Sequence, residues 1–342
     1  MNKAGKILSI SPPNAIPGGE VIIDCEGLEL EDLNSFTCYF NRKKARIVAA
    51  ASNRVLAIVP ENNGMQIVDV HFENHGDVSN SQKLMVGKRL AGDLHLVANP
   101  AVDPKDDSII VTRSGSRGQE LPVTLLRLGT DGYLGEFSAN VMNPTGIAFD
   151  DHGKLFVTNR ADGEVCQINH DEEIVPISSD LGVATGIAFD RDGKMFVGDR
   201  SGTIFRISGL GTSDTWAVLE PSVSAYHMAF GKDGRLYVTA PGLCSFDSVY
   251  RIDEDGIDEV FFKGLGRPQG LAFDSDGNLY VAACKDGKHG IIRISQDGME
   301  SEFFLAGMSI VGLCFTRQGE LIVATGDSVF SLPLEITGTL LD

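Results

Sequence analysis

Short apolar segments alternate with polar turns along the chain, and from about residue 98 onward they follow a repeat. An apolar strand, an Asp- and Gly-containing turn and a second apolar strand recur in GIAFDDHGKLFVT (146–158), GIAFDRDGKMFVG (186–198), MAFGKDGRLYVT (228–239) and GLAFDSDGNLYVA (270–282). The turn glycines stand 40, 41, 43 and 42 residues apart, at Gly153, Gly193, Gly234, Gly277 and Gly319. This period is typical of a four-stranded propeller blade. A more divergent copy at 99–112 and a last copy at 312–324 predict six blades in all.

A propeller has to join its two ends, because open sheet edges are prone to aggregation. The last copy runs out of strands after residues 328–332. Two segments are candidates for the missing strand, namely residues near 84–95 and the tail 335–341. The first choice would connect the ring to the part of the chain that precedes it.

Residues 1–87 lack the repeat. Short alternating segments at 6–10, 20–25, 36–40, 45–50, 54–59, 66–72 and 83–86 are separated by turns such as Pro-Gly-Gly. Such a density of short strands predicts a small Greek-key sandwich. The predicted fold class is therefore all-β, with an immunoglobulin-like sandwich over residues 1–87 and a six-bladed β-propeller over residues 88–342.

The opening ILSISPPNAIPGGEVIIDCEGL resembles the IPT/TIG family of immunoglobulin-like domains. That family repeats a strand, a proline pair, a Pro-Gly-Gly turn and a strand ending in Gly, which match Ile7, Pro12, Pro17, Gly18, Gly19, Val21 and Gly27. The resemblance implies a spacer or interaction module without catalysis.

The repeat resembles NHL-type propellers, with FVTNRADGEVCQI (156–168) as the nearest copy, and six blades also resemble the senescence-marker-protein/gluconolactonase group. This resemblance implies the fold. It does not choose an activity, because propellers host lactonases, lyases and binding platforms alike.

The chain of 342 residues has a formal net charge of −18. This charge opposes binding to nucleic acid or to an anionic membrane, since both require a basic surface. No apolar run approaches the length of a membrane span, and the first residues show no secretory h-region, so we expect a cytoplasmic location. We expect buried free thiols, because no C-x-x-C pair occurs among Cys25, Cys38, Cys166, Cys244, Cys284 and Cys314.

In a propeller, the loops that enter the inner strands and leave the second strands meet at one mouth of the channel, where we expect a ligand. Aligned on Gly146, the blades begin their inner strands with Ala98-Asn99, Thr145-Gly146, Thr185-Gly186, Tyr226-His227, Gln269-Gly270 and Val311-Gly312. The candidate ligand-binding residues are the polar members, Asn99, Thr145, Thr185, Tyr226, His227 and Gln269. Alternatively, these side chains cap strand ends and hold channel water.

The gluconolactonase-like enzymes place Asn and Asp side chains at the first aligned position in several blades, with a Glu from another, to hold a divalent ion. This chain departs from that pattern at every aligned position. Thr and Gln offer neutral oxygens without the charge that gives Ca²⁺ or Mg²⁺ sites their affinity. We therefore predict no metal site and no cofactor, and a polar ring suited to an uncharged or weakly charged ligand.

His227 occupies a position where four other blades have glycine. It is a candidate general base or ligand contact, and the alternative is a histidine that simply packs beside Tyr226.

Arg160 and Arg200 follow the second strands of two neighbouring blades, with Arg113 one place earlier in the first blade. On one rim these arginines could bind a carboxylate or phosphate, or each could pair with a turn carboxylate such as Asp162 or Asp199.

The repeated turns contain Asp residues but lack the ligand span and closing Glu of a calcium loop. We interpret them as hairpin turns in which Asp accepts backbone N–H groups and Gly takes a positive φ.

The main functional hypothesis is a non-catalytic binding or assembly protein that recognises a protein partner or small-molecule ligand at a propeller face. The alternative is a lactone- or sugar-directed hydrolase or lyase with a degenerate metal site and His227 as base. Self-association through residues 1–87 is a third hypothesis.

Overall fold

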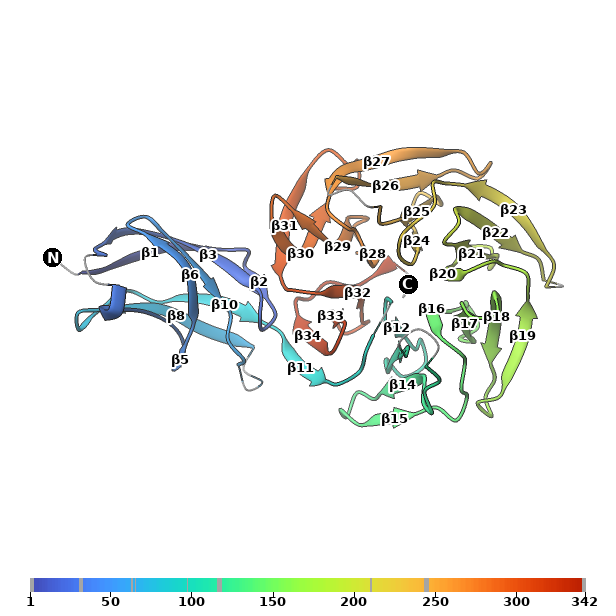
Figure 1. The fold of residues 1–342 in the computed structure, drawn as a ribbon, viewed down its shortest axis with the longest axis horizontal. Coiled ribbons are helices and arrows are strands. Elements are labelled where there is room, and N and C mark those ends of the chain that lie inside the picture. Colours follow the sequence, from blue (N-terminus) through green and yellow to red (C-terminus); the bar gives the residue numbers. More distant parts are fainter. Residues whose placement is uncertain are drawn as a thin grey trace.

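The computed structural model describes residues 3–30, 33–62, 64, 66–96, 98–115, 119–209, 211–242 and 246–339. Within these ranges every regular element is a β-strand except the short 3-10 helix η1 (Leu33–Ser35). The strands form a ring of sheets with a separate pair of sheets beside it (Figure 1). None of the described segments is a helix long and apolar enough to cross a membrane.

The ring consists of six blades of four strands arranged around a central channel (Figure 1), and the blade formed by β28 to β31 is part of a larger, ten-stranded sheet. Blade one comprises β12 (Ala101–Val102), β13 (Ile109–Thr112), β14 (Leu125–Leu128) and β15 (Leu134–Glu136). Blade two comprises β16 (Pro144–Phe149), β17 (Leu155–Asn159), β18 (Glu164–Ile168) and β19 (Ile174–Ser178). Blade three comprises β20 (Ala184–Phe189), β21 (Met195–Asp199), β22 (Thr203–Ile207) and β23 (Ser213–Val218). Blade four comprises β24 (His227–Phe230), β25 (Leu236–Thr239), β26 (Asp247–Ile252) and β27 (Asp258–Leu265). Blade five comprises β28 (Leu271–Phe273), β29 (Leu279–Lys285), β30 (Lys288–Ile294) and β31 (Ser301–Ala306). Blade six comprises β32 (Ile310–Phe315), β33 (Glu320–Thr325), β34 (Val329–Pro333) and β11 (Lys88–Ala91). This arrangement confirms the predicted six-bladed β-propeller.

Strand β11 closes the ring. It pairs antiparallel with β34, with Lys88 opposite Ser331 and Arg89 opposite Phe330. Of the two segments proposed from the sequence, the one near residues 84–95 is therefore correct, and the tail 335–341 is not the closing strand. Closure by a segment that precedes the first blade ties the start of the ring to its end.

Aromatic contacts join neighbouring blades. The phenylalanine that ends an inner strand packs, at an angle, on an aromatic ring from the second strand of the preceding blade. The ring centroids lie 4.8–5.2 Å apart in the pairs Phe156–Phe189, Phe196–Phe230, Tyr237–Phe273 and Tyr280–Phe315. The repeated Gly-Ile-Ala-Phe phrase thus supplies one such ring to several of the interfaces between blades.

The glycine that precedes this phenylalanine permits a close approach between blades. A Cβ added to Gly146 would lie 2.3 Å from the carbonyl oxygen of Thr185, and one added to Gly186 would lie 2.8 Å from that of Tyr226. Both distances are shorter than real Cβ contacts, so a side chain at either position would separate the blades. Blade four departs from this rule, because His227 stands at the aligned position.

The N-terminal part forms two sheets around a common core that includes Ile23, Phe72 and Leu84. One sheet contains β1 (Ala4–Ser11), β3 (Glu20–Leu28), β7 (Arg54–Ile58) and β6 (Arg46–Ala51), in this order. The other contains β5 (Lys43–Lys44), β4 (Phe36–Phe40), β8 (Ile67–Asn74), β10 (Gln82–Val86) and β2 (Asn14–Ala15). In this second sheet β9 (Asp77–Val78) also pairs with β8. All seven strands predicted in this part are present. The short strands β2, β5 and β9 were not predicted.

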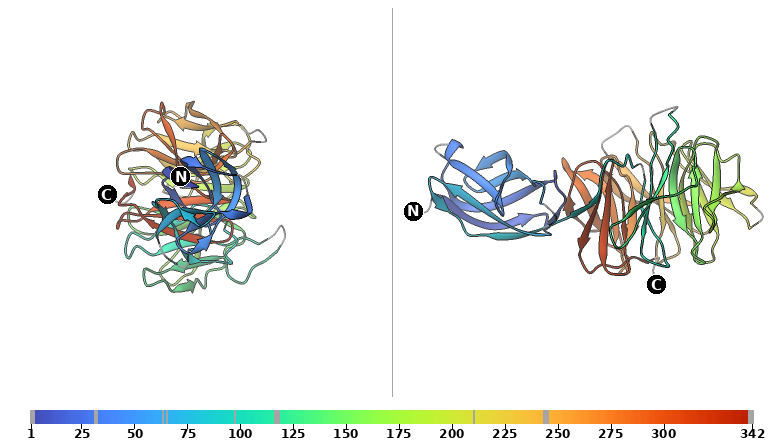
Figure 2. Two further views of the ribbon diagram at one scale, coloured as in Figure 1. Left: turned by 90° about the vertical axis from the view of Figure 1, so that its left-hand side faces the viewer. Right: turned by 90° about the horizontal axis from the view of Figure 1, so that it is seen from below.

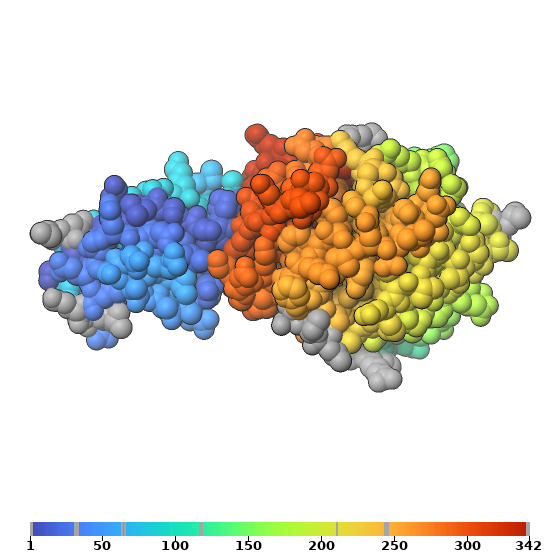
Figure 3. Space-filling model, turned by 90° about the horizontal axis from the view of Figure 1, so that it is seen from above, coloured from blue at the N-terminus to red at the C-terminus, as the bar shows by residue number. Residues whose placement is uncertain are grey.

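The N-terminal sheets are joined to the propeller through β2, which pairs in parallel with both β10 and β31. One sheet therefore continues from the N-terminal part into blade five, and the two parts abut directly (Figure 3). Ile16 packs with Leu305 and Leu332 of the propeller, and its N–H donates to the carbonyl of Ala306 at 2.9 Å. A single residue, Gly87, separates β10 from β11.

The turn aspartates act as predicted. Oδ1 of Asp150 accepts the backbone N–H groups of His152 and Lys154 at 3.0 and 2.8 Å. Asp190 and Asp274 make the same pair of bonds in their own turns. The turn glycines have φ between 70° and 87°, which confirms the positive φ expected at Gly153, Gly193, Gly234, Gly277 and Gly319.

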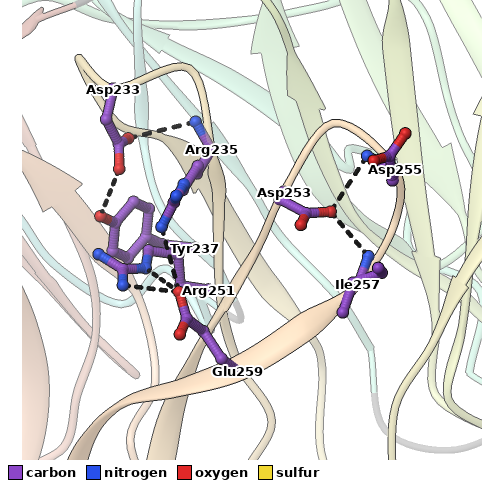
Figure 4. Close-up of polar contacts among 8 residues, drawn as sticks. All are labelled: Asp233, Arg235, Tyr237, Arg251, Asp253, Asp255, Ile257 and Glu259. Carbon is purple, nitrogen blue, oxygen red and sulfur yellow. Dashed lines mark hydrogen bonds and ion pairs between the residues drawn. The ribbon is translucent and has the colours of Figure 1, made fainter.

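Blade four shows how such carboxylates are used within a blade (Figure 4). Asp253 accepts the N–H groups of Asp255 and Ile257 at 3.1 and 2.9 Å. In the neighbouring group, Arg235 and Arg251 both reach the same Oε1 of Glu259, and the Tyr237 hydroxyl donates to Asp233. These charges stabilise the blade itself.

The cysteines of the described residues are free. Burial raises the pKa of Cys25 and Cys166 to about 11 and that of Cys38 to about 12, so these thiols stay protonated. Cys284 and Cys314 are half-buried, and Cys244 lies outside the described residues.

Candidate functional site

The channel of the propeller contains a cavity of about 370 Å³ that is lined by residues of all six inner strands. Small side chains occupy one level of its wall, namely Ala101, Ala148, Ala188, Ala229, Ala272 and Cys314. A level of phenylalanines follows at Phe149, Phe189, Phe230, Phe273 and Phe315. The small residues provide the width of the cavity, and the wall is mostly apolar.

The cavity runs between the two faces of the ring, which we call the loop face, where the inner strands begin, and the turn face, which carries the turn aspartates. At the loop end it is lined by Thr185, Tyr226 and His227, which are all buried. At the turn end it is lined by Asp151 and Arg191, which are both exposed. The cavity therefore meets solvent on the turn face, and its polar inner end lies toward the loop face.

His227 is the most unusual residue of the inner end. It is 4% exposed, and its ring hydrogen-bonds the side chain of Gln269 in blade five. Its Nε2 atom is buried and has no hydrogen-bond partner among the described residues. Burial lowers the pKa of His227 to about 4 against the opposing effect of the Gln269 bond, so the imidazole is neutral at neutral pH.

Tyr226 and His227 point to opposite sides of blade four, because consecutive strand residues alternate. The Tyr226 side chain lies against Gly198 of blade three, and its hydroxyl donates to the carbonyl oxygen of Glu220. Burial raises the pKa of this phenol well above its usual range. The side chain of His227 therefore lies on the side of blade four that faces Gln269.

Asn99 crosses the inner end of the channel from blade one. Its Nδ2 donates to the carbonyl of Leu271 in blade five at 3.0 Å, and its Oδ1 accepts the N–H of Leu313 in blade six at 3.1 Å. The side chain thus ties three inner strands together. Its amide is already used in these bonds, and it narrows the cavity at this end.

The two threonines of the predicted ring differ in their contacts. The Thr185 hydroxyl donates to the carbonyl of Gly198 and accepts the N–H of Tyr226, both at 3.1 Å. The Thr145 hydroxyl is buried and has no partner among the described residues. Thr185 lines the cavity, whereas Thr145 and Gln269 are not among the described residues that line it.

The three predicted arginines belong to the loop face, and none of them lines the cavity among the described residues. Burial, together with the nearby charge of Arg200, lowers the pKa of Arg160. Neither arginine forms an ion pair within the described part of the chain. The proposed pairing with Asp162 or Asp199 is not formed, because Asp199 accepts the N–H of Val183 at 2.7 Å and Asp162 accepts from the side chain of an asparagine. Arg113 is half-buried, and its Nε has no partner among the described residues.

The tail after β34 contributes to the turn face, which the sequence did not indicate. Ser275 donates its N–H to the carbonyl of Thr337 at 2.7 Å, and Asp274 forms an isolated bridge with Gly338. Gly338 and Thr339 line the cavity. The chain thus returns to the centre of the ring on one of its faces, where it covers part of the opening (Figures 1 and 2).

Other turn-face residues tie blades to one another. Arg191 donates to the carbonyl of Lys232 in the next blade, Lys232 donates to that of Ser275, and Arg317 donates to that of Pro104. No cluster of three or more His, Cys, Asp or Glu side chains suited to a metal ion occurs in the part of the chain that the structure describes. The donors at the inner end of the cavity are neutral hydroxyl, amide and imidazole groups, which suit hydrogen bonding better than a hard cation.

No protein-family model and no curated protein matches this chain. Solved structures match its fold. A gluconolactonase from Xanthomonas campestris is similar over 72% of this chain and 89% of its own, with 16% identity and a TM-score of 0.58. An auxiliary nutrient binding protein from Bacteroides ovatus is similar over 97% of this chain and 99% of its own, with 12% identity and a TM-score of 0.57.

A catalytically inactive histidine-to-alanine variant of virginiamycin B lyase from Staphylococcus aureus, solved with quinupristin, is similar over 92% of this chain and 99% of its own. Its identity is 15% and its TM-score 0.53. At such identities the similarity concerns the fold, which is a propeller of the gluconolactonase kind. The match to the nutrient binding protein extends over the N-terminal sheets as well.

Proposed function

We propose that this chain is a non-catalytic binding protein whose propeller channel holds a small organic ligand. The observation that carries the proposal is the cavity of about 370 Å³, whose wall is mostly apolar and whose inner end is lined by Thr185, Tyr226 and His227. Small-molecule sites are typically concave and mostly apolar, and they orient their ligand with a few polar groups.

The donor set supports binding over metal-dependent lactone hydrolysis. The aligned positions at which gluconolactonase-like enzymes carry acidic metal ligands hold Thr145, Thr185 and Gln269 here. These side chains are neutral, and a divalent cation binds tightly only where carboxylates supply charge. The overall similarity to a nutrient binding protein is compatible with a binding role.

The second candidate is an enzyme of the lyase or hydrolase kind, with His227 as general base. One observation favours it. The imidazole of His227, a residue that lines the cavity, is neutral at neutral pH, which is the state in which a histidine accepts a proton. The similar lyase structure is described as catalytically inactive when a histidine is replaced by alanine.

Other roles are assigned to the remaining parts. We propose that residues 1–87 form an IPT/TIG-like domain of immunoglobulin fold that acts as a spacer or in self-association, ahead of the propeller at 88–342. Arg113, Arg160 and Arg200 form a cationic group on the loop face that suits an acidic protein partner. The acidic chain itself suits a cytoplasmic protein that binds neither nucleic acid nor membrane.

A thermal-shift screen of small organic compounds tests the main proposal. A ligand at a hundredfold its Kd raises the free energy of unfolding by about 2.7 kcal/mol. The shift should disappear in Ala148→Leu or Ala272→Leu, which fill the cavity from two different blades, provided that the variant alone remains folded. If no compound stabilises the protein, or if the shifts survive in both filled variants, the channel is not the binding site.

The same compounds distinguish the two candidates. Any compound that binds is incubated with the wild type and with His227→Phe, and the mixture is analysed by mass spectrometry. Unchanged compound in both samples supports a binding protein. A product formed only by the wild type supports the enzyme and overturns the non-catalytic proposal.

A further inference from the structure

We infer that the ligand of the channel is an uncharged organic amide, held by the backbone of the inner strands of blades two and three. Blades five and six hold the side-chain amide of Asn99 in the same way. This inference rests on the proposed function and adds the chemical class of the ligand and the groups that recognise it.

Each inner strand is an edge strand, and its free edge faces the channel. Strands β16, β20, β24, β28 and β32 each pair, along their length, only with the second strand of their own blade. In an antiparallel pair, every second residue bonds its N–H and C=O to the partner strand, and the residues between them direct these groups away from it. Those intervening residues therefore present backbone donors and acceptors to the channel.

Hydrogen bonds in the turns determine which residues these are. In blade three the N–H of Asp190 donates to the carbonyl of Lys194 at 3.0 Å, and the register continues to Ala188 opposite Phe196. Ala188 lies two places before Asp190, so it also bonds to β21, and Ile187 directs its N–H and C=O to the channel. The same turn bond and register give the equivalent residues of blades two, four, five and six, which are Ile147, Met228, Leu271 and Leu313.

The side chain of Asn99 shows how such groups recognise an amide. Its Nδ2 donates to the carbonyl of Leu271 at 3.0 Å, and its Oδ1 accepts the N–H of Leu313 at 3.1 Å. Both bonds agree with the direction that the register assigns to these backbone groups. One amide thus bridges two neighbouring blades, with a carbonyl of the earlier blade and an N–H of the later blade as its partners.

Blades two and three offer the same two groups. Within the part of the chain that the structure describes, neither a side chain nor the tail bonds to the channel-facing backbone of Ile147 or Ile187. Both residues line the cavity and are 7% exposed, whereas the corresponding residues beside Asn99 are 1% exposed. The carbonyl of Ile147 and the N–H of Ile187 are therefore accessible to an amide in the cavity.

Glycines distinguish this pair of blades from the next one. A Cβ added to Gly270 would lie 2.0 Å from Oδ1 of Asn99, and one added to Gly312 would lie 2.4 Å from its Cα, so this amide requires both glycines. Blades two and three have glycine at both equivalent positions, Gly146 and Gly186. Blade four has His227 there, so blades two and three match the Asn99 site better than blades three and four.

The wall of the cavity determines the rest of the ligand. An apolar cavity of ~150 Å³ holds one benzene molecule, so about 370 Å³ with mostly apolar walls suits a body of two fused rings. The solvent end is lined by three carboxylates and one guanidinium, those of Asp150, Asp151, Asp190 and Arg191. This net negative charge disfavours an anion, which leaves an uncharged amide with an apolar body.

Three naphthalene probes of nearly the same shape test the chemical class by calorimetry with the full chain. 1-Naphthamide has an N–H donor and a carbonyl acceptor, 1-acetylnaphthalene has a methyl group in place of the NH₂, and 1-naphthoate is anionic. We expect the amide to bind about 5- to 13-fold more tightly than the ketone, which corresponds to one hydrogen bond of roughly 1–1.5 kcal/mol. 1-Naphthoate should bind most weakly of the three.

A matched pair of proline substitutions tests the position of the amide. Proline lacks an N–H and is tolerated in an edge strand where that N–H faces away from the partner strand. Ile187→Pro removes the N–H that donates to the ligand, whereas Ile147→Pro, also after a glycine, removes an N–H that the ligand does not use. The affinity for 1-naphthamide should fall about 5- to 13-fold in Ile187→Pro and stay unchanged in Ile147→Pro.

The outcomes separate the two proposals. If neither neutral probe binds, the proposed small-ligand function fails together with this inference. If the ketone or 1-naphthoate binds as tightly as the amide, or if the two proline variants bind the amide equally, the inference alone is overturned. Should a proline variant not fold, a crystal structure of the wild type with 1-naphthamide decides. A carboxamide between Ile147 and Ile187 supports the inference, and any other position overturns it.

Discussion

The burial of His227 makes the stability of the protein depend on pH. Its pKa falls from an ordinary value of 6.5 to about 4 in the folded chain, and burial is the main cause. As the pH falls below 6.5, His227 therefore becomes protonated in the unfolded chain, whereas in the folded chain it does so only near pH 4. The resulting loss of stability begins as the pH falls through 6.5, continues to about 4, and is absent at higher pH.

The magnitude follows from the two pKa values. Between pH 7 and pH 5 the wild type should lose about 2 kcal/mol of unfolding free energy through His227 alone. In His227→Phe this loss should be absent, so the variant gains about 2 kcal/mol relative to the wild type over the same range. Its stability at pH 7 is a separate quantity that includes the lost bond to Gln269.

Urea unfolding at pH 7, 6 and 5 measures the effect. The single tryptophan, Trp216, packs on Phe196 in blade three with ring centroids 4.7 Å apart, so its fluorescence reports on the propeller. His170→Gln is the matched control, because His170 is fully exposed, and its curve should follow that of the wild type. If the unfolding free energies of wild type and His227→Phe run parallel from pH 7 to pH 5, the argument that burial holds this imidazole neutral is refuted.

Three other predictions concern the ring. Asn99→Ala removes both hydrogen bonds that the side chain makes to blades five and six, and it should lower the unfolding free energy by about 2 kcal/mol. An unchanged melting temperature would show that these two bonds do not stabilise the ring. A chain that begins after Lys88–Ala91 exposes the edge of β34, so in light scattering it should self-associate more than a chain that begins at Gly87, which also lacks β2 but keeps β11; equal masses contradict this. Replacing Arg160 by Gln removes its like-charge repulsion with Arg200 and should leave stability unchanged or raised by up to ~0.5 kcal/mol, and a clear loss of stability would refute this reasoning.

Local patterns predicted most of the fold. The strands of residues 1–87, the six blades and the turn chemistry follow from alternation and from Asp-Gly turns, which depend on residues near one another in sequence. The inner strand of blade one was expected to begin at Ala98-Asn99, but β12 covers only Ala101–Val102. Asn99 leaves the strand because its side chain bonds to blades five and six, which lie about half the chain away in sequence.

The candidate site was predictable only in part. Alignment of the blades selected His227 because it interrupts a column of glycines, and the structure places it beside the cavity with an unpartnered nitrogen. The end at which the cavity opens could not be read from the repeat. It depends on Asn99 and on the tail at Gly338, and both act through contacts between distant residues. The arginines lack their expected carboxylates because backbone N–H groups and side-chain amides occupy those carboxylates first.

The way the ring closes limits which N-terminal domains could replace residues 1–87 by recombination. The strand that completes blade six lies one residue after the last strand of the N-terminal sheets, and β2 from those sheets extends blade five. A recombination event that swapped the N-terminal sheets at Gly87 would remove β2 from the edge of blade five and would cut the chain one residue before the strand that completes blade six. The propeller could accept a different neighbour only if that neighbour replaced β2 and left β11 free to pair with β34. The two parts should therefore be inherited as one unit, although each has a core of its own.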